Sequence, residues 1–289
     1  MKIAFIYDHK PNETWSTPMA LVNEFIVRGW ETNIVSINKG DNLLKQFIES
    51  DEQPDIIMFL DWGRFDSPYL NKALKPNSFW IQESGDDPQN FQRNYPKSNR
   101  FHYTITPDKQ SAQEYRNRGI NAEWVNHFAD TKVQFPMNLE PEYVAVTSRG
   151  PGGSEFLDYL TQWAEGSVGN RNGMNAEEHT KFLNSGLMVI QNSRWKEITR
   201  RLFEGMACGK LVLTDNLPEE TGLRDIFIDG EDIVYYNDMF DCIEKMNYYN
   251  ENEVERERIA HNGMKKVLEN YTQVQVVSKL IEKYKLHNI

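Results

Sequence analysis

Short apolar runs alternate with amphipathic segments along the whole chain, and this alternation constrains the fold more than any other feature of the sequence. Residues 3–7 form an apolar run, residues 18–28 carry apolar side chains at helical spacing up to Gly29, and residues 32–37 form a second run. A strand, a helix and a strand in this order predict a parallel sheet. Further runs follow at residues 55–60, 78–81, 101–105 and 122–125. The sequence therefore predicts a doubly wound α/β fold.

The alternation stops once and then starts again. Pro136 and Pro141 flank a short polar stretch that has neither helical nor strand periodicity, and the next apolar run begins at Tyr143. A chain of 289 residues has room for about two domains of ordinary size. The expected parts are a first Rossmann-like domain at residues 1–136, a second at residues 141–270, and a C-terminal helix at residues 271–289 that packs back toward the first domain.

Composition excludes several classes of protein. The two cysteines, Cys208 and Cys242, have no second cysteine at metal-binding spacing, so a disulfide framework and a structural zinc site are both disfavoured. The formal net charge of −11 works against nonspecific attraction to a nucleic-acid backbone. No apolar stretch approaches the about 20 residues of a membrane span, and the N-terminus lacks the pattern of a signal peptide. We expect a cytoplasmic protein.

The stretch from Arg200 to Asp215 is the most informative one for function. It predicts a helix that ends at Gly209, where the cap needs a left-handed residue, followed at once by a buried strand. Arg201 and Glu204 are three residues apart and share one helical face. A carboxylate placed there can accept both ribose hydroxyls of a nucleotide, and an arginine can meet diphosphate oxygens. The alternative is an exposed ion pair within the helix.

This stretch resembles the donor-binding motif of GT-B glycosyltransferases, the glycosyl transferases group 1 family, and most closely its CgeB-like group. The resemblance rests on residues 201–204 (Arg-Leu-Phe-Glu) and on residues 207–209 (Ala-Cys-Gly). It is good over about residues 180–285 and weaker but consistent over the rest of the chain. It implies two Rossmann-like domains facing across a cleft, with a nucleotide sugar held by Thr199, Arg200, Arg201 and Glu204. One departure is Lys196, which stands where the larger retaining families have a first glutamate.

A glycine-rich run follows the first expected strand of the second domain. Its backbone amides could approach an anion at the start of the next helix. The residues concerned are Arg149, Gly150, Gly152 and Gly153. The resemblance implies that Arg149 contacts the donor diphosphate, whereas the alternative is a flexible loop between strand and helix.

Three residues are candidates for the chemistry on the acceptor. His9 and Asp86 follow expected strands of the first domain, where loop side chains could act as a base. His127 follows a third strand and could touch the transferred sugar or the diphosphate, although it could equally be a solvent-facing loop residue. Asp86, Asp87 and Pro88 are typical of a turn, and the resemblance implies that basic residues and amides replace a metal, so we expect no metal site.

The function implied is transfer of a hexosyl or pentosyl group from a nucleoside diphosphate sugar to an acceptor hydroxyl. A UDP-sugar is the first candidate for this donor. The donor is a substrate and no cofactor is expected, while the acceptor could be a glycan, a protein, a small molecule or modified nucleic acid, and the oligomeric state is open. The alternatives are a nucleotide-sugar epimerase of the same fold and a noncatalytic nucleotide-sugar-binding protein. A dinucleotide oxidoreductase is disfavoured because neither opening strand leads into Gly-x-Gly-x-x-Gly.

Overall fold

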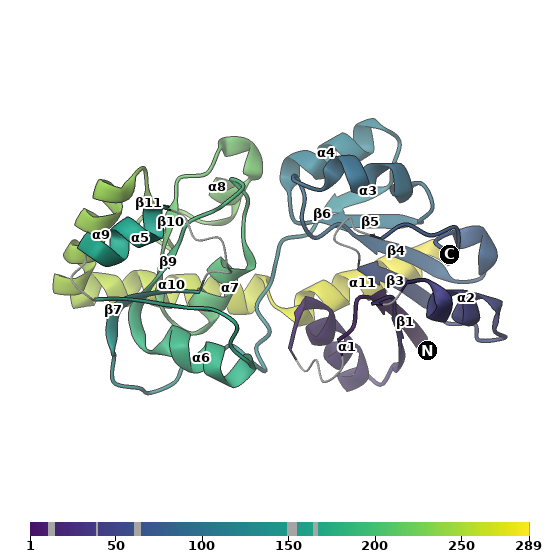
Figure 1. Cartoon of the computed structure of the whole chain (residues 1–289), viewed down its shortest axis with the longest axis horizontal. Coiled ribbons are helices and arrows are strands. Elements are labelled where there is room, and N and C mark those ends of the chain that lie inside the picture. The colour runs from purple at the N-terminus through teal and green to yellow at the C-terminus, as the bar shows by residue number, and fades with distance from the viewer. Residues whose placement is uncertain (11–14, 39, 61–64, 149–154, 164–166, 289) are drawn as a thin grey trace. The chain divides into compact units, whose positions relative to one another are not determined.

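The chain forms two compact α/β units. The computed structural model describes residues 1–10, 15–38, 40–60, 65–148, 155–163 and 167–288. Contacts divide the chain into Met1–Asn126 together with Gln273–Ile289, and His127–Thr272. The first unit is thus built from both ends of the chain (Figure 1). The division comes after Asn126, ahead of the proline-flanked stretch where the sequence suggested it, and that stretch lies within the second unit.

The first unit is a six-stranded parallel sheet in the order β2-β1-β3-β4-β5-β6. Its strands are β1 (Lys2–Tyr7), β2 (Glu31–Ser36), β3 (Ile56–Leu60), β4 (Phe79–Glu83), β5 (Tyr103–Thr106) and β6 (Ala122–Trp124). Its helices are α1 (Thr17–Val27), α2 (Asn42–Glu49), α3 (Phe91–Ser98), α4 (Lys109–Asn117) and α11 (Gln273–His287), with a 3₁₀ turn at Lys72–Leu74. Every residue of β3 and β4 is buried, as expected where helices cover both faces of a parallel sheet.

Local signals set the first helix. The Ser16 hydroxyl accepts a hydrogen bond from the Met19 amide at 3.2 Å, and Pro18 stands in the first turn, an arrangement that favours a helix start. The helix closes at Arg28, and Gly29 has φ 77°, a left-handed conformation that glycine adopts at little cost. The predicted stop at Gly29 is therefore confirmed, and the chain turns directly into β2.

The C-terminal helix α11 is fixed to the first unit by charged contacts. The Glu123 carboxylate accepts hydrogen bonds from Lys279 at 2.6 Å and from the Tyr103 hydroxyl at 2.7 Å, and it lies 2.8 Å from the Lys283 ammonium. Burial acts to raise the pKa of Glu123, but these partners lower it to about 2. At the N-terminal end of α11, Arg28, the residue that caps α1, donates to the Val274 carbonyl at 2.8 Å. These contacts assign α11 to the first unit.

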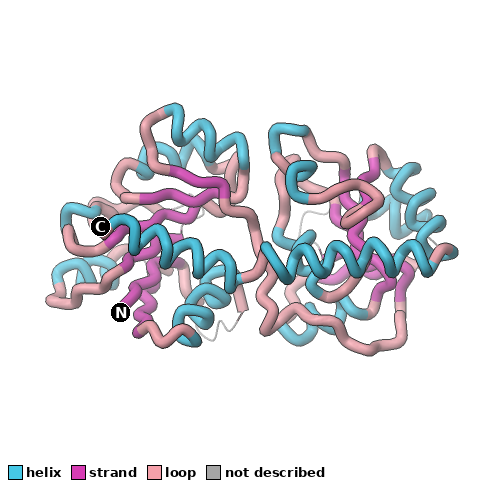
Figure 2. The backbone as a smooth tube through the Cα atoms, turned by 180° about the vertical axis from the view of Figure 1, so that it is seen from behind, coloured by secondary structure: helices cyan, strands magenta, loops and turns pink. Residues whose placement is uncertain are grey.

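The second unit is a five-stranded parallel sheet in the order β11-β10-β9-β7-β8. Figure 2 draws the strands of both sheets in magenta, with the helices around them in cyan. Its strands are β7 (Tyr143–Ser148), β8 (Val168–Arg171), β9 (Gly186–Gln191), β10 (Leu211–Asp215) and β11 (Val234–Tyr236). Its helices are α5 (Glu155–Trp163), α6 (Ala176–Asn184), α7 (Arg200–Ala207), α8 (Leu223–Ile226), α9 (Met239–Glu251) and α10 (Glu253–Asn270), with a 3₁₀ turn at Glu219–Thr221. The sequence did not predict β8, an edge strand whose last two residues are exposed.

Helix α7 lies close against this sheet because Gly205 has no side chain. A Cβ at Gly205 would approach Val212 and Val189 to 3.1 and 3.2 Å, tighter than ordinary packing. The helix ends before Gly209, which has φ 72°, so the predicted glycine cap is confirmed. Across the described parts of both units, we find no helix whose length and apolar character would carry it through a lipid bilayer.

Candidate functional site

The order in which the chain adds strands to the second sheet reverses between β7 and β9. From β7 the chain leads to β8 on one side, and it then returns to β9 on the other side. In open α/β sheets, ligands bind at the carboxyl edge beside such a point. Ser148 is the last residue of β7 and Gln191 the last of β9, and both are buried. Helix α7 begins after the loop that follows Gln191, so its N-terminus belongs to the same edge.

Glu204 is a buried carboxylate on α7. Its side chain is 5% exposed, and its Oε1 lies 2.8 Å from Arg200 Nε one helical turn earlier. Its Oε2 lies 3.9 Å from His179 Nε2 on α6. Glu204 therefore pairs with Arg200, four residues earlier in α7, and this pair is largely buried instead of lying exposed on the helix surface.

Arg201 turns to the sheet instead. Its Nε donates to Gln191 Oε1 at 3.0 Å, which leaves the Gln191 amide nitrogen as a buried donor. In the described part of the chain, Gln191 Nε2, Thr199 Oγ1 and Thr214 Oγ1 are buried and make no hydrogen bond. A buried polar group without a partner costs about 1–3 kcal/mol, and such groups mark places that water or a ligand completes. All three belong to the end of a strand or to the start of α7.

His127 is partly buried beside the two arginines. Burial lowers the pKa of His127 to about 4, and the positive charges of Arg200 and Arg201 act in the same direction. The imidazole is therefore neutral at neutral pH and is a weak base. Its position beside Arg200 and Arg201 fits a hydrogen-bonding role toward an anion better than proton abstraction.

His179 belongs to the same cluster, and the sequence analysis did not single it out. Its Nε2 lies 3.2 Å from Ser148 Oγ, and the residue is 4% exposed. A signal existed in the sequence, because Asn175 and Glu178 form a capping box that starts α6. Counting from that start places His179 on one helical face with Phe182 and Leu183, both of which are buried.

The loop between β9 and α7 is held by the next strand. The Asp215 carboxylate at the end of β10 accepts hydrogen bonds from the Ser193 amide at 2.8 Å and from Lys196 Nζ at 3.1 Å. Lys196 has φ 55°, which is uncommon for a residue with a side chain. The position where larger families carry a glutamate is therefore occupied by a lysine that is tied to the sheet.

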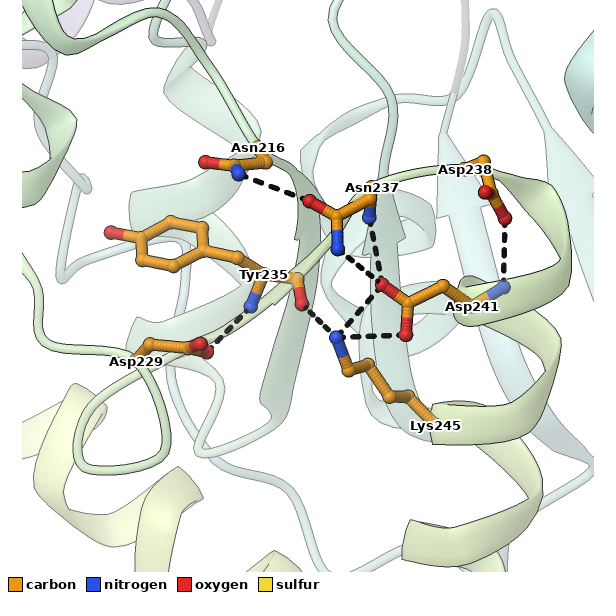
Figure 3. Close-up of polar contacts among 7 residues, drawn as sticks. All are labelled: Asn216, Asp229, Tyr235, Asn237, Asp238, Asp241 and Lys245. Atoms are coloured by element: carbon orange, nitrogen blue, oxygen red, sulfur yellow. Dashed lines mark hydrogen bonds and ion pairs between the residues drawn. The ribbon is translucent and has the colours of Figure 1, made fainter.

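The far end of the same edge carries a polar cluster at the ends of β10 and β11 (Figure 3). Lys245 on α9 donates to Asp241 and to the Tyr235 carbonyl, and Asn237 donates its backbone and side-chain nitrogens to Asp241. Asn216, which follows β10, donates to Asn237 at 3.1 Å. The cluster holds the ends of β10 and β11 together, whereas Glu204 lies on α7, which follows β9.

Two further expectations concern the glycine-rich run and a metal site. Arg149, Gly150, Gly152 and Gly153 lie outside the described residues. For the part of the chain that is described, no three histidine, cysteine, aspartate or glutamate side chains gather in a way that could hold a metal ion.

In the first unit, His9 lies where the strand order reverses beside β1, as it does beside β7 in the second unit. There β1 is flanked by β2 and β3, so the chain winds away from β1 on either side, and His9 follows the end of β1. Its Nδ1 lies 2.8 Å from the hydroxyl of Tyr7, and that hydroxyl donates to Met19 Sδ at 3.2 Å. With the hydroxyl donating to sulfur, its oxygen accepts from His9 Nδ1–H, and the lone pair of the imidazole is then on Nε2.

Asp86 and Asp87 lie in a turn after β4, and their side chains differ. Asp86 is partly exposed and accepts a hydrogen bond from Asn90 at 3.3 Å. Asp87 is 2% exposed and accepts hydrogen bonds from Thr106 at 3.0 Å and Asn94 at 3.2 Å. Burial raises the pKa of Asp87 to about 6, although these hydrogen bonds favour the carboxylate. Asp87 fixes the turn that carries Asp86.

Solved structures of glycosyltransferases share this fold. Sucrose-phosphate synthase from Thermosynechococcus elongatus superposes with a TM-score of 0.70 at 12% identity, covering 99% of this chain and 98% of that one. HepE of Anabaena, solved in complex with UDP-glucose, gives a TM-score of 0.70 at 12% identity over 100% of both chains. A glycosyltransferase from Rickettsia africae gives 0.64 at 13% identity, covering 98% and 97%. The two sheets thus define the GT-B class.

The family follows from the sequence of the second half. A family model described as glycosyl transferase-like matches residues 136–282, more than half of the chain. The chain belongs to this family and is a glycosyltransferase, which confirms the resemblance seen in its motifs. No curated protein is significantly similar to it in sequence.

The buried Asp87 predicts a specific dependence of stability on pH. Because its pKa is raised from 3.8 to about 6 in the folded chain, the folded state binds the proton more tightly, and stability is lost as pH rises between these values. The variant Asp87→Asn lacks this titration. Relative to the wild type, its free energy of unfolding should therefore rise between about pH 4 and pH 6, by at most about 3 kcal/mol.

Urea unfolding of both proteins across this pH range measures the effect. The two proteins share every other titratable group, so the difference between them isolates Asp87. A difference that stays constant with pH would show that Asp87 titrates normally.

Proposed function

We propose that this glycosyltransferase uses a UDP-sugar as donor, bound at the carboxyl edge of the second sheet, and transfers the sugar to an acceptor hydroxyl without a metal. The observation that carries the proposal is the buried Glu204 carboxylate. Glu204 lies on α7, one of its oxygens is held by Arg200, and the buried hydroxyl of Thr199 at the start of the same helix makes no hydrogen bond within the described part of the chain. HepE, which shares the fold, has been solved with UDP, with UDP and glucose, and with UDP-glucose, which favours uridine as the base.

The donor contacts follow from the chemistry of each group. Glu204 Oε2 accepts hydrogen bonds from the ribose hydroxyls, since Oε1 is engaged by Arg200 at 2.8 Å. The guanidinium groups of Arg200 and Arg201 face the diphosphate, which a planar fork of N–H donors suits. Thr199 at the start of α7 adds a hydroxyl, and the helix N-terminus favours negative charge.

Arginines can replace a metal in this reaction. The leaving diphosphate gains negative charge as the glycosidic bond breaks, and preorganised positive groups stabilise that charge most strongly in the transition state. Arg200 and Arg201 supply two such charges, and neutral His127 can add a hydrogen bond. Their mutual repulsion is moderated by Glu204, which pairs with Arg200.

The base that activates the acceptor hydroxyl is His9. It follows β1 at the edge where the first unit would bind a ligand, and hydrogen bonding to Tyr7 orients its ring. The Nδ1–H tautomer leaves Nε2 to take the proton from the hydroxyl. His127 is less suitable because its pKa is lowered to about 4.

Glu204→Gln tests the donor site. Gln keeps the volume of the side chain but not the charge that accepts two ribose hydrogen bonds, and hydrogen bonds to charged groups are worth about 1.5–3 kcal/mol each. Calorimetric titration should show UDP and UDP-glucose binding weakened by roughly tenfold to a hundredfold. The matched control is Glu177→Gln, which alters an exposed glutamate paired with Lys181 on α6. This variant should bind UDP and UDP-glucose with unchanged affinity. Unchanged affinity in folded Glu204→Gln would refute the donor site.

His9→Asn tests the base. The Asn amide can still donate to Tyr7, but it has no group in place of Nε2. Release of UDP from UDP-glucose, with water or a panel of sugar and phenolic hydroxyls as acceptors, should slow by about 10²–10⁴-fold, while UDP affinity stays unchanged. Asp86→Asn serves as the comparison and should keep most of its activity. The opposite ranking of these two variants would assign the base to Asp86.

Removal of divalent ions tests the role of the arginines. Release of UDP from UDP-glucose should continue in excess EDTA, because Arg200 and Arg201 already provide the positive charge that the diphosphate needs. Loss of activity on chelation, restored by magnesium or manganese, would contradict this part of the proposal.

A further inference from the structure

We propose that His179 is a positioning residue of the donor site, which as a neutral imidazole orients Glu204 and joins it to the end of β7. The inference rests on the proposed donor site and adds to it a residue on α6, a helix to which no role has been given so far. His179 does not need to touch the donor. It acts through Glu204, whose second oxygen it faces.

The geometry places His179 between two parts of the site. Its Nε2 lies 3.2 Å from Ser148 Oγ, at the end of β7, and 3.9 Å from Glu204 Oε2, on α7. These two residues stand on opposite sides of the point where the strand order reverses. A single ring nitrogen therefore faces both the strand that leads into the glycine-rich run and the carboxylate proposed to bind ribose. The side chains of His179 and Glu204 are each 5% exposed.

Neutrality of the imidazole is what this arrangement requires. Burial lowers the pKa of His179, Glu204 acts to raise it, and Arg200 and Arg201 lower it again. A charged imidazolium would form an ion pair with Glu204 Oε2 and occupy the oxygen that the ribose hydroxyls need. A neutral ring that is hydrogen-bonded to Ser148 restricts the rotation of the carboxylate and leaves this oxygen able to accept from the donor.

Packing alone does not account for a histidine at this position. The other buried polar side chains of α6, Thr180 and Asn184, donate to the carbonyls of Val133 and Phe135. The buried positions one turn after His179, Phe182 and Leu183, are apolar, so an apolar side chain at His179 would fill the space without the cost of burying a polar ring. The capping box of Asn175 and Glu178 fixes where α6 begins. The start of α6 is therefore fixed without any contribution from His179. This start also fixes where the imidazole lies along the helix, next to Ser148.

Two substitutions separate positioning from packing. In His179→Gln the side-chain amide reaches the place of Nε2, whereas in His179→Asn it reaches only the place of Nδ1. Both are polar and both lose the ring, so a merely structural role would affect them alike. We expect His179→Gln to bind UDP and UDP-glucose within about threefold of the wild type, and His179→Asn to bind them at least about tenfold more weakly by calorimetry, a loss of about 1.4 kcal/mol.

Phe182→Leu provides the matched control on the same helix. Phe182 is buried and packs against Tyr143 and Arg171, so this variant should lower the melting temperature without changing UDP affinity. Should His179→Asn fail to fold, Ser148→Ala, which removes the hydroxyl that holds the ring, is the second variant, and it should weaken UDP binding as well.

The outcomes distinguish the two proposals. Equal affinities of His179→Gln and His179→Asn, whether both normal or both weak, would overturn the positioning role. If Glu204→Gln weakens UDP binding while His179→Asn does not, only the role of His179 fails. If Glu204→Gln binds UDP normally, the donor site itself is wrong, and the role of His179 falls with it.

Discussion

Parallel pairing of the strands is the constraint on which the rest of this structure depends. In a parallel sheet every strand ends at the same edge, so residues far apart in sequence meet there without any other device. Ser148, Gln191 and Asp215 each end a strand of the second sheet, and His9 follows a strand of the first. The reversal of strand order beside β7 and beside β1 then selects one place on each edge. Chemistry is concentrated there because helices cover the faces of both sheets.

The charged groups around Glu204 in the second unit carry a net positive charge and have little access to water. Glu204 is flanked by a cation, Arg200, on one side and by a neutral ring, His179, on the other. The same arginines contribute to keeping His127 and His179 uncharged. An anion that enters this environment meets positive charge and neutral donors whose orientation is already set. The cost of ordering these groups is met in folding, before any ligand binds.

Most of the fold could be predicted from periodicity, whereas the site could be predicted only in part. Most of the strand positions were visible as apolar runs, but β8 was not, because half of its short sequence is exposed. Glu204 was found through its motif, but its pairing with Arg200 was not predicted, since spacings of three and four residues both place side chains on one helical face. His179 and Gln191 were missed because their roles depend on contacts between elements, which a single sequence does not encode locally.

The assignment of α11 to the first unit has a consequence for synthesis. The ribosome makes β1 to β6 first, but the contacts of Lys279 and Lys283 with Glu123, and of Tyr284 with Asp55, need the last residues of the chain. The second unit, His127–Thr272, is contiguous and can fold as its own segment emerges. The strands of the first unit are therefore made before the second unit, but the helix that packs against them is made after it.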